Sequence, residues 1–352
     1  MSGRPWMIYG ANGYTGRLVA ERAQGQGLFP VLAGRDESKV RPLAEKLGLP
    51  WKAFGLSSAV EAAQGIKDVD LVLHCAGPFS ATSRPMVDAC LKTGTHYLDI
   101  TGEIDVFESI FAREAEAQKA GSVLMPGVGF DVVPSDCLAA TLKEALPDAT
   151  DLDLAFQGLG KASPGTTKTA VEGLPQGGKA RRGGKIVKVP PAYKVREAPL
   201  GGRMRTLVSI PWGDVSTAYY STGIANITTY IPMPKLAITA MKFSRPFLPL
   251  LGLEPVQNFL KKIVEKRIHG PTAEDRASGR VYLWGEARNA AGKKVSAALD
   301  VPEGYDFTVL AALACAERVL AGEVPPGCWT PSKAFGADFV TRIPGTKMDV
   351  QG

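Results

Sequence analysis

The sequence is poor in the residues that bind metal ions. It has three histidines and five cysteines among 352 residues, and no two cysteines have the Cys-x-x-Cys spacing of a zinc or redox site. The histidines, His74, His96 and His269, are far apart and share no ligand spacing. We therefore expect free thiols and no metal site.

Long apolar runs are also missing. No stretch of about 18 uncharged apolar residues occurs, so no transmembrane helix is predicted. The apolar run before Gly10 is only a few residues long, which is too short for a secretory signal peptide. These two absences predict a cytoplasmic protein.

Neither sign of charge dominates the chain. It has 41 Lys and Arg against 35 Asp and Glu, a net charge of +6, with one dense basic cluster at 179–188, "KARRGGKIVK". Such a cluster is typical of a solvated loop, and a patch for nucleic acid or anionic lipid is the alternative. We predict no nucleic-acid partner.

The length predicts two domains, because single cores stop growing near roughly 250 to 300 residues. The first 130 residues alternate short apolar runs with helical patterns, which indicates parallel β-α-β units. The expected strands are 6–9, 30–33, 51–54, 70–76, 97–101 and 122–125, and the expected helices are 17–24, 37–47, 59–64, 85–92 and 107–119. The predicted fold class is α/β, with a Rossmann-type doubly wound parallel sheet of about six strands.

The pattern changes after residue 133. One more helix is predicted at 135–146, and from 151 to about 301 period-two strands such as "DLDLAFQG" alternate with Gly and Pro. We predict a second, mixed α/β domain with a largely antiparallel sheet over 134–303. The Rossmann domain, 1–133, would be completed by 304–352, which begins with a long apolar helix.

Residues 234–268 form a distinct apolar stretch inside the second domain. Its apolar residues recur at helical spacing, and Pro246, Pro249 and Pro255 divide it, so two or three short helices are expected. Core or dimer packing is the plain interpretation. A lid, a peripheral membrane or lipid contact and the wall of a slot for an apolar substrate remain alternatives.

The turn "GANGYTG" predicts a dinucleotide site. Gly10, Gly13 and Gly16 stand directly after a predicted strand and before an amphipathic helix. Glycines let the backbone turn sharply and approach a pyrophosphate, whose charge the N-terminus of the following helix stabilises. A glycine triplet alone is a weak signal, and its position between strand and helix gives it weight.

The end of the second predicted strand selects the cofactor. A site for NAD places a carboxylate about 20 residues after the glycines to bind the ribose 2′-hydroxyl. This chain has Arg35 there, and a guanidinium suits the 2′-phosphate of NADP, with Ser38 and Lys39 as additional contacts. Asp36 is one residue too late and is expected to point to the other side. We therefore predict NADP(H).

Three further strands bring polar groups to the same edge of the sheet, where open α/β sheets bind ligands. The predicted cofactor-binding residues are Gly10, Asn12, Gly13, Tyr14, Thr15, Gly16, Gly34, Arg35, Lys39, Ala76, Gly77, Pro78 and Thr101. The candidates for proton transfer are His74, Glu103, Asp131 and Lys168. For His74 a packed core histidine is the alternative, and for Asp131 a helix cap or turn carboxylate.

The Tyr-x-x-x-Lys pair of short-chain dehydrogenases is missing. No tyrosine has a lysine four residues later, and Tyr230 and Lys235 are one residue too far apart. The sequence therefore disfavours that family.

Six motifs together resemble the saccharopine-dehydrogenase-like oxidoreductases, and within them the branch that includes trans-acting enoyl reductases. The motifs are "GANGYTG", "AGR" at 33–35, "CAGPF" at 75–79, "GTHYLDITGE" at 94–103, "PGVGFDVVPSD" at 126–136 and "PGCWTPSKAFG" at 326–336. The resemblance implies a Rossmann domain completed by the C-terminal helix, a middle α/β domain and a nicotinamide cofactor. The branch usually has a Gly-Gly-Thr-x-x-Ser turn, and residues 163–169 read "SPGTTKT" here, so the substrate end of the site is expected to differ.

The expected function is NADP(H)-dependent hydride transfer to or from an enoyl or carbonyl group of an apolar, lipid-like small molecule at the domain cleft. One alternative is a saccharopine-reductase-like imine or amino-acid dehydrogenase. Another is a non-catalytic protein that senses NADP(H) or binds a lipid surface. We expect a homodimer.

Overall fold

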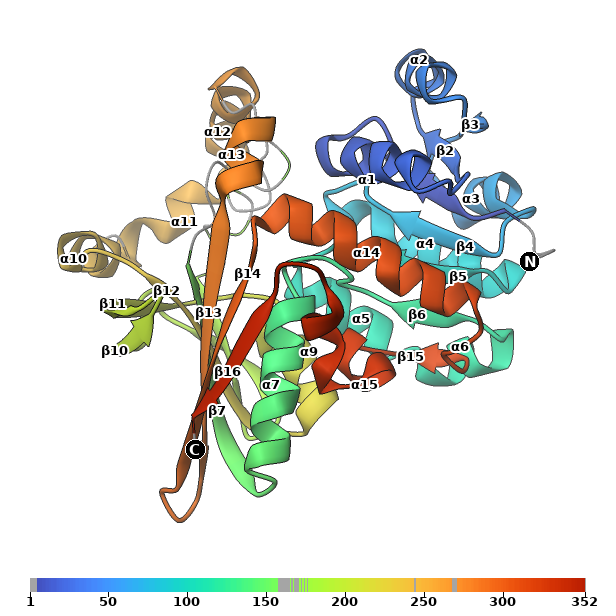
Figure 1. Ribbon diagram of the computed structural model, residues 1–352. Coiled ribbons are helices and arrows are strands. Elements are labelled where there is room, and N and C mark those ends of the chain that lie inside the picture. Colours follow the sequence, from blue (N-terminus) through green and yellow to red (C-terminus); the bar gives the residue numbers. More distant parts are fainter. Residues whose placement is uncertain are drawn as a thin grey trace. The chain divides into compact units, whose positions relative to one another are not determined.

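The computed structural model describes residues 5–157, 177–243, 245–267 and 271–351, with positions 165, 167, 171, 173 and 175. The chain divides into two compact units (Figure 1). The first comprises Met1–Val133 with Tyr305–Ala334, and the second comprises Pro134–Gly304 with Phe335–Gly352.

The first unit is built on a seven-stranded sheet in the order β15-β6-β5-β4-β1-β2-β3. All of its strand pairs are parallel. Its strands are β1 (Met7–Tyr9), β2 (Val31–Gly34), β3 (Trp51–Ala53), β4 (Leu71–His74), β5 (His96–Asp99), β6 (Val123–Met125) and β15 (Gly327–Cys328). The predicted Rossmann-type sheet is confirmed, with β15 as a seventh strand.

Helices connect these strands. They are α1 (Tyr14–Gly25), α2 (Glu37–Leu47), α3 (Ala59–Ile66), α4 (Phe79–Thr93), α5 (Ile104–Phe111), α6 (Glu114–Ala120) and α14 (Gly304–Leu320). The chain proceeds from β1 to β3 in one direction along the sheet and then from β4 to β6 in the other. The order therefore reverses between β1 and β4, and open α/β sheets bind ligands at such a switch point.

The second unit is built on a nine-stranded sheet in the order β10-β11-β12-β7-β13-β14-β16, with β8 and β9 joined to it through β12. Only the pair β12 and β7 is parallel among the described residues. Its strands are β7 (Ala149–Gln157), β8 (Gly178–Arg182), β9 (Lys185–Val189), β10 (Val195–Leu200), β11 (Arg203–Ile210), β12 (Asn226–Pro232), β13 (Arg280–Asn289), β14 (Lys294–Pro302) and β16 (Lys347–Gln351). The predicted mixed domain with a largely antiparallel sheet is confirmed.

The division of the C-terminal segment differs from the expectation. Residues 335–352 belong to the second unit, because β16 pairs antiparallel with β14, for example Leu299 with Met348. Only 305–334 joins the Rossmann sheet, through α14 and β15.

Helix α7 (Val133–Ala145) packs on one face of the second sheet. Leu138 and Leu142 lie so close to Gly285 of β13 that a side chain at position 285 would meet them. The remaining helical elements of this unit are α9 (Asp214–Thr222), α10 (Lys235–Phe243), η2 (Arg245–Phe247), α11 (Leu248–Leu251), α12 (Glu254–Arg267), α13 (Ala273–Ser278), α15 (Pro331–Phe335) and η3 (Ala337–Arg342), with α15 crossing the boundary between the units.

The stretch 234–268 forms short helices, as predicted from its prolines. Pro246 lies in the 3-10 turn η2, Pro249 in α11 and Pro255 in the first turn of α12, where a proline costs little. In the part of the chain that the structure describes, no helix combines the length and the hydropathy that crossing a bilayer requires.

Candidate active site

The glycine turn lies at the switch point of the parallel sheet. Gly10 follows β1 with a φ of +84°, a conformation that only glycine adopts readily. A Cβ at this position would lie 2.7 Å from the amide nitrogen of Ala76, which follows β4. The two strand ends therefore touch, and both positions are among the predicted cofactor-binding residues.

The other two glycines bring helix α1 close to the turn. A Cβ at Gly16 would lie 2.3 Å from the carbonyl oxygen of Gly10, and one at Gly13 would lie 3.2 Å from it. Gly13 is the N-cap of α1, no side chain bonds to this cap, and the first turn has no acidic residue. Because the first N–H groups of a helix have no partner within it, this end suits a phosphate.

The end of β2 carries the group predicted to select NADP. Arg35 is exposed directly after β2. Asn12 of the glycine turn reaches the same place, since a Cβ at Gly34 would lie 2.8 Å from its Oδ1 atom. The structure thus brings the glycine turn and the end of β2 together, as an adenosine-binding edge requires.

Asp36 serves helix α2 as its N-cap. Its Oδ1 atom accepts hydrogen bonds from the Ser38 amide at 3.0 Å and the Ser38 hydroxyl at 2.6 Å. Lys39 pairs with its other oxygen at 3.4 Å. The Ser38 hydroxyl contributes most to lowering the pKa of Asp36. Asp36 is therefore engaged within its own helix turn, and the contacts of Ser38 and Lys39 with a phosphate stay predictions.

Glu103 caps a helix from a distant part of the sequence. Its carboxylate accepts hydrogen bonds of 2.8 Å from the amides of Phe79 and Ser80, in the first turn of α4. A carboxylate at a helix N-terminus stabilises the helix through its amides and its dipole. Pro78 precedes these amides in a cis bond with Gly77. Glu103 thus serves as a helix cap in the structure, and its role in proton transfer stays a prediction.

His74 is packed into the core of the first unit. The rings of Tyr9, Phe79 and Tyr97 lie 5.4 to 6.1 Å from its ring centre. Its Nε2 atom is 3.1 Å from the Thr82 hydroxyl. Burial lowers the pKa of His74 to about 3, so the ring is neutral near pH 7. These contacts match the alternative of a packed core histidine for Nε2, while Nδ1 is buried and has no hydrogen-bond partner among the described residues.

Asp99 organises the loops that follow β5 and β6. It accepts hydrogen bonds from the Tyr97 hydroxyl at 2.7 Å, the Thr101 amide at 3.0 Å and the Gly127 amide at 2.8 Å. Burial raises its pKa to about 6, and the hydrogen bonds oppose that rise. Thr101 is fully buried, and its hydroxyl accepts from the Glu103 amide. Its side chain therefore supports the turn, which does not favour the predicted cofactor contact.

Asp131 combines partial exposure with a carboxyl group that titrates near neutral pH. It lies in the loop after β6, and a Cβ at Gly102 would be 2.6 Å from its Oδ2 atom. Desolvation raises its pKa from 3.8 to about 7. A proton donor or acceptor works best with a pKa near the operating pH. Of the three candidates for proton transfer that the structure describes, Asp131 has the properties that fit the role best.

Lys168, the fourth candidate, and most of the "SPGTTKT" segment lie outside the described residues.

Helix α14 contacts both α1 and the loop after β6. Tyr305 packs edge-to-face on Tyr14 of α1, with ring centres 4.9 Å apart. The Phe130 amide donates a 3.0 Å hydrogen bond to the hydroxyl of Thr308. The sequence predicted this helix but not these contacts, because residues so far apart in the chain carry no local signal.

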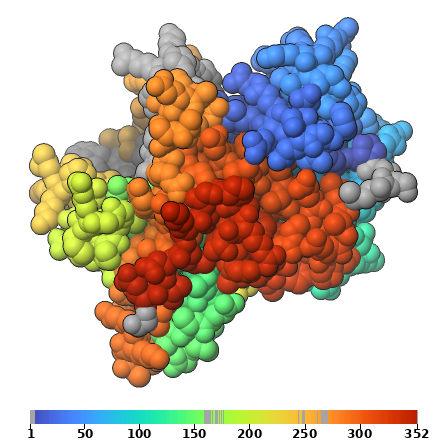
Figure 2. Space-filling view, viewed as in Figure 1, coloured from blue at the N-terminus to red at the C-terminus, as the bar shows by residue number. Residues whose placement is uncertain are grey.

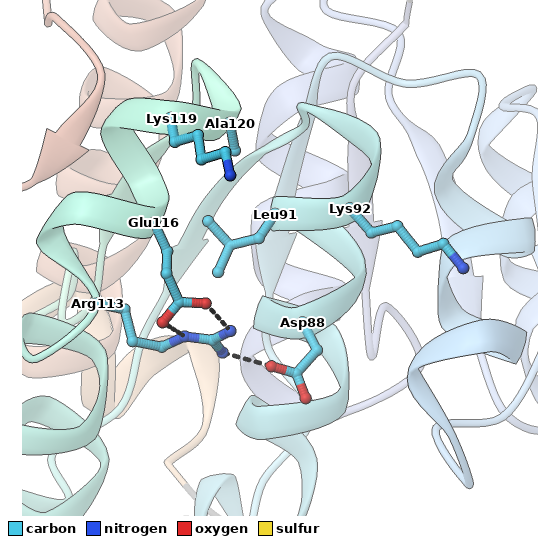
Figure 3. A pocket seen from close by; sticks show the side chains of 7 residues that line it. All are labelled: Asp88, Leu91, Lys92, Arg113, Glu116, Lys119 and Ala120. Carbon is cyan, nitrogen blue, oxygen red and sulfur yellow. Dashed lines mark hydrogen bonds and ion pairs between the residues drawn. The ribbon is translucent and has the colours of Figure 1, made fainter.

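A surface depression of about 450 Å³ lies between α4 and α6 (Figure 3). Arg113 there binds Asp88 and also donates to Glu116, at 2.8 Å from its Nη2 atom. Because both carboxylates neutralise this guanidinium, it is not a free anion site. Asp88 also lies in the last two turns of α4, at the opposite end from the carboxyl edge of the sheet.

The five cysteines are free thiols. Among the described residues no group of three or more His, Cys, Asp or Glu side chains is arranged to hold a metal ion.

The part of the chain that forms most of the parallel sheet matches a known protein family. Residues 6–125, which run from β1 to β6, match the family described as the saccharopine dehydrogenase NADP binding domain. The match is confined to this part of the chain. The match confirms the resemblance to saccharopine dehydrogenases that the motifs indicated. The family description also names NADP, the cofactor that we predicted from Arg35.

Two curated relatives and one solved structure extend the comparison. The chain is similar to the saccharopine dehydrogenase-like oxidoreductase of Mus musculus, with 31% identity over 150 residues that cover 37% of this chain and 35% of that protein. It is also similar to the trans-acting enoyl reductase of Mycobacterium leprae, with 35% identity over 140 residues that cover 37% and 33%. The chain thus spans about a third of each relative.

The apo saccharopine dehydrogenase (L-Glu forming) of Saccharomyces cerevisiae resembles the whole chain, with a TM-score of 0.67. The alignment covers 99% of this chain and 100% of that one at 13% identity. At this identity the likeness concerns the fold alone.

Proposed function

We propose that this protein is an NADP(H)-dependent oxidoreductase that transfers hydride to or from an enoyl or carbonyl group of an apolar, lipid-like substrate. The observation that carries the proposal is the edge of the parallel sheet. There the glycine turn and Arg35 fit NADP, and Asp131 adds a carboxyl group with a pKa of about 7. The names of the mouse and mycobacterial relatives support oxidoreduction and, for the second, an enoyl substrate.

Each group at this edge has a distinct task in the proposal. NADPH, when bound, supplies the hydride. The first turn of α1 and the backbone at Gly10 hold the pyrophosphate, and Arg35 holds the 2′-phosphate. Reduction of an enoyl group adds hydride to one carbon and a proton to the other, and in this proposal Asp131 supplies that proton. Glu103 and Asp99 position the loops that carry these groups.

A substrate panel tests the proposal. The purified chain is mixed with NADPH and, in turn, a trans-2-enoyl thioester, a long-chain aldehyde, and an amino acid with an aldehyde that together form an imine. Loss of NADPH absorbance and a reduced product by mass spectrometry are expected with the enoyl or aldehyde compound. Turnover of the imine alone would favour an amino-acid dehydrogenase.

One variant tests whether the turnover depends on the proposed proton donor. Asp131→Asn should lower the turnover of the active substrate while NADPH still binds. Tight binding of NADPH without turnover of any class of compound would contradict the proposal and favour a protein that senses NADP(H). A dimer stays a prediction, which sedimentation equilibrium checks.

A further inference from the structure

Helices α10 to α12 expose an unusual share of large apolar side chains. The structure exposes twelve such side chains among the described residues, and six of them lie between positions 236 and 263. They are Leu236, Phe243, Leu250, Leu253, Phe259 and Ile263. We call these six residues the α10–α12 surface. Single exposed apolar residues are ordinary, but a concentration of them marks an interaction site.

Helix α10 is apolar on both of its faces. Ile238 is buried against Ala192 and Val208, with Met241 beside it, which fastens the inner face to the protein. The outer face follows the helical spacing i, i+7, with Leu236 exposed by 83% and Phe243 by 76%. Figure 2 shows α10 at the surface, in gold at the left edge of the view. Exposing an apolar stripe of this kind to water is energetically unfavourable.

Helix α12 repeats the arrangement. Val264 is buried on its inner face, and the side-chain amide of Gln257 donates a 2.7 Å hydrogen bond to the carbonyl of Leu251. On the outer face Phe259 and Ile263, one turn apart, are exposed by 63% and 38%. Both helices are thus held by one face and present apolar side chains on the other.

The charge of the same segment favours an anionic partner. Residues 235–267 contain seven Lys and Arg and two Glu, a net charge of +5, whereas the whole chain has +6. Lys242 and Lys262 are exposed beside the outer stripes. Apolar side chains flanked by lysines are the pattern of helices that lie in the headgroup region of anionic membranes.

A neighbouring loop is bonded to the same segment. The Arg245 guanidinium donates hydrogen bonds to the carbonyls of Pro191 at 2.7 Å and Ala192 at 3.3 Å. The next residue, Tyr193, is exposed by 40%. Tyrosine is common where an apolar phase meets water, because its ring is apolar and its hydroxyl is polar.

We propose that the α10–α12 surface docks this protein on an anionic lipid bilayer, with the outer stripes of α10 and α12 at the level of the headgroups. A second copy of the chain is a poorer partner for this surface. Two copies facing each other would bring Lys242 and Lys262 of one copy near the same lysines of the other, and lysine is depleted from protein interfaces. The residues of this surface belong to the second unit, and the residues predicted to bind NADP belong to the first. Docking at this surface would give the protein a membrane partner in addition to its proposed chemistry.

Vesicle sedimentation with the full chain tests this proposal. The vesicles are phosphatidylcholine alone or phosphatidylcholine mixed with phosphatidylglycerol. We expect binding to the mixed vesicles and little to the neutral ones, and weaker binding as the salt rises above about 0.1 M, since salt screens exposed charges. Equal binding to both kinds of vesicle, or binding to neither, would overturn the proposal.

Matched variants locate the contact. The double substitution Phe243→Ser with Phe259→Ser should lower the partition coefficient about tenfold or more. The control, Phe29→Ser with Met204→Ser, removes side chains of similar exposure, 66% and 64%, elsewhere on the chain and should leave binding unchanged. An equal loss in both variants would overturn the assignment to this surface.

A second pair of variants keeps the test valid if the first does not fold. Lys242→Glu with Lys262→Glu changes exposed charges only, and it should also weaken binding to the mixed vesicles. Circular dichroism and NADPH binding report on folding for every variant. Conversion of a dimer to a monomer by Phe243→Ser with Phe259→Ser, without vesicle binding by the parent chain, would assign the surface to a second copy and refute the proposal.

Discussion

At the scale of single residues, Arg35 is the group on which the choice of cofactor depends. It is exposed directly after β2, and Asp36, the nearest carboxylate, is occupied as the N-cap of α2. Asp36 is thus already engaged by the first turn of α2. The guanidinium is the natural partner of a 2′-phosphate, because planar, charge-assisted bonds to phosphate are strong.

Substitution of this arginine should change the cofactor preference. Arg35→Asp is expected to weaken NADP binding about 10- to 100-fold, since a charged hydrogen bond is lost and a like charge is added. Binding of NAD should change far less. Calorimetric titration of both cofactors measures the ratio. The control is Arg41→Ala, which removes another exposed arginine, in helix α2. An unchanged ratio in Arg35→Asp would refute our assignment.

Asp131 should give the reaction its pH dependence. With a pKa of about 7, its carboxyl group loses its proton as the pH rises through neutrality. As a proton donor it would make the rate of substrate reduction fall over that range. Asp131→Asn should lower kcat about 100-fold or more and remove this dependence. A pH profile of the variant that keeps the same inflection would exclude Asp131 as the donor.

The same carboxyl group should also affect stability. The pKa of Asp131 is raised in the folded state, from 3.8 to about 7, so the folded protein holds a proton that the unfolded chain has released. Stability therefore falls as the pH rises from about 4 to about 7. Asp131→Asn cannot titrate and should be more stable than the parent by about 1–2 kcal/mol at pH 8 and above. Urea denaturation at several pH values measures this, and a loss of stability in the variant would contradict it.

At the scale of elements, the close approach of α1 to β1 requires glycine. A side chain at Gly16 would overlap the carbonyl oxygen of Gly10, whereas one at Gly25, the last residue of the same helix, would meet nothing within 4 Å. The two positions are therefore a matched pair on one helix.

Alanine at these two positions should have opposite effects. Gly16→Ala should lower the free energy of unfolding by about 2 kcal/mol and weaken NADP binding, because α1 must move from the turn. Gly25→Ala should be neutral or stabilise the protein by up to about 1 kcal/mol. Thermal unfolding with and without NADP compares them. Equal effects of the two substitutions would show that the turn is not sterically demanding.

At the scale of the whole molecule, all the described residues assigned to the cofactor lie in the first unit. Binding of NADPH at about 100 times its Kd should stabilise that unit by about 2.7 kcal/mol. Hydrogen exchange of peptides over α1 and α2 should therefore become slower. The β13–β14 hairpin of the second unit is the internal reference, and equal protection there would contradict a site confined to the first unit.

Local patterns in the sequence were sufficient for most of the parallel sheet. Strands buried on both faces are continuous apolar runs bounded by glycine, proline or polar residues, so six of the seven strands were predicted within a few residues. Strand β15 was missed because Gly327–Cys328 is only two residues long. Helix α4 was predicted to begin at Pro85 and begins at Phe79, because Glu103, far along the chain, caps its first turn.

The sequence by itself determined the glycine turn, Arg35 and the order of strands and helices, because each depends on neighbours within a few residues. The tertiary structure decided the surroundings of the candidate side chains at the sheet edge. It buried His74 among aromatic rings, made Glu103 a helix cap and raised the pKa of Asp131. Burial and capping depend on groups brought together from distant positions, and desolvation exists only once the chain has folded around the group.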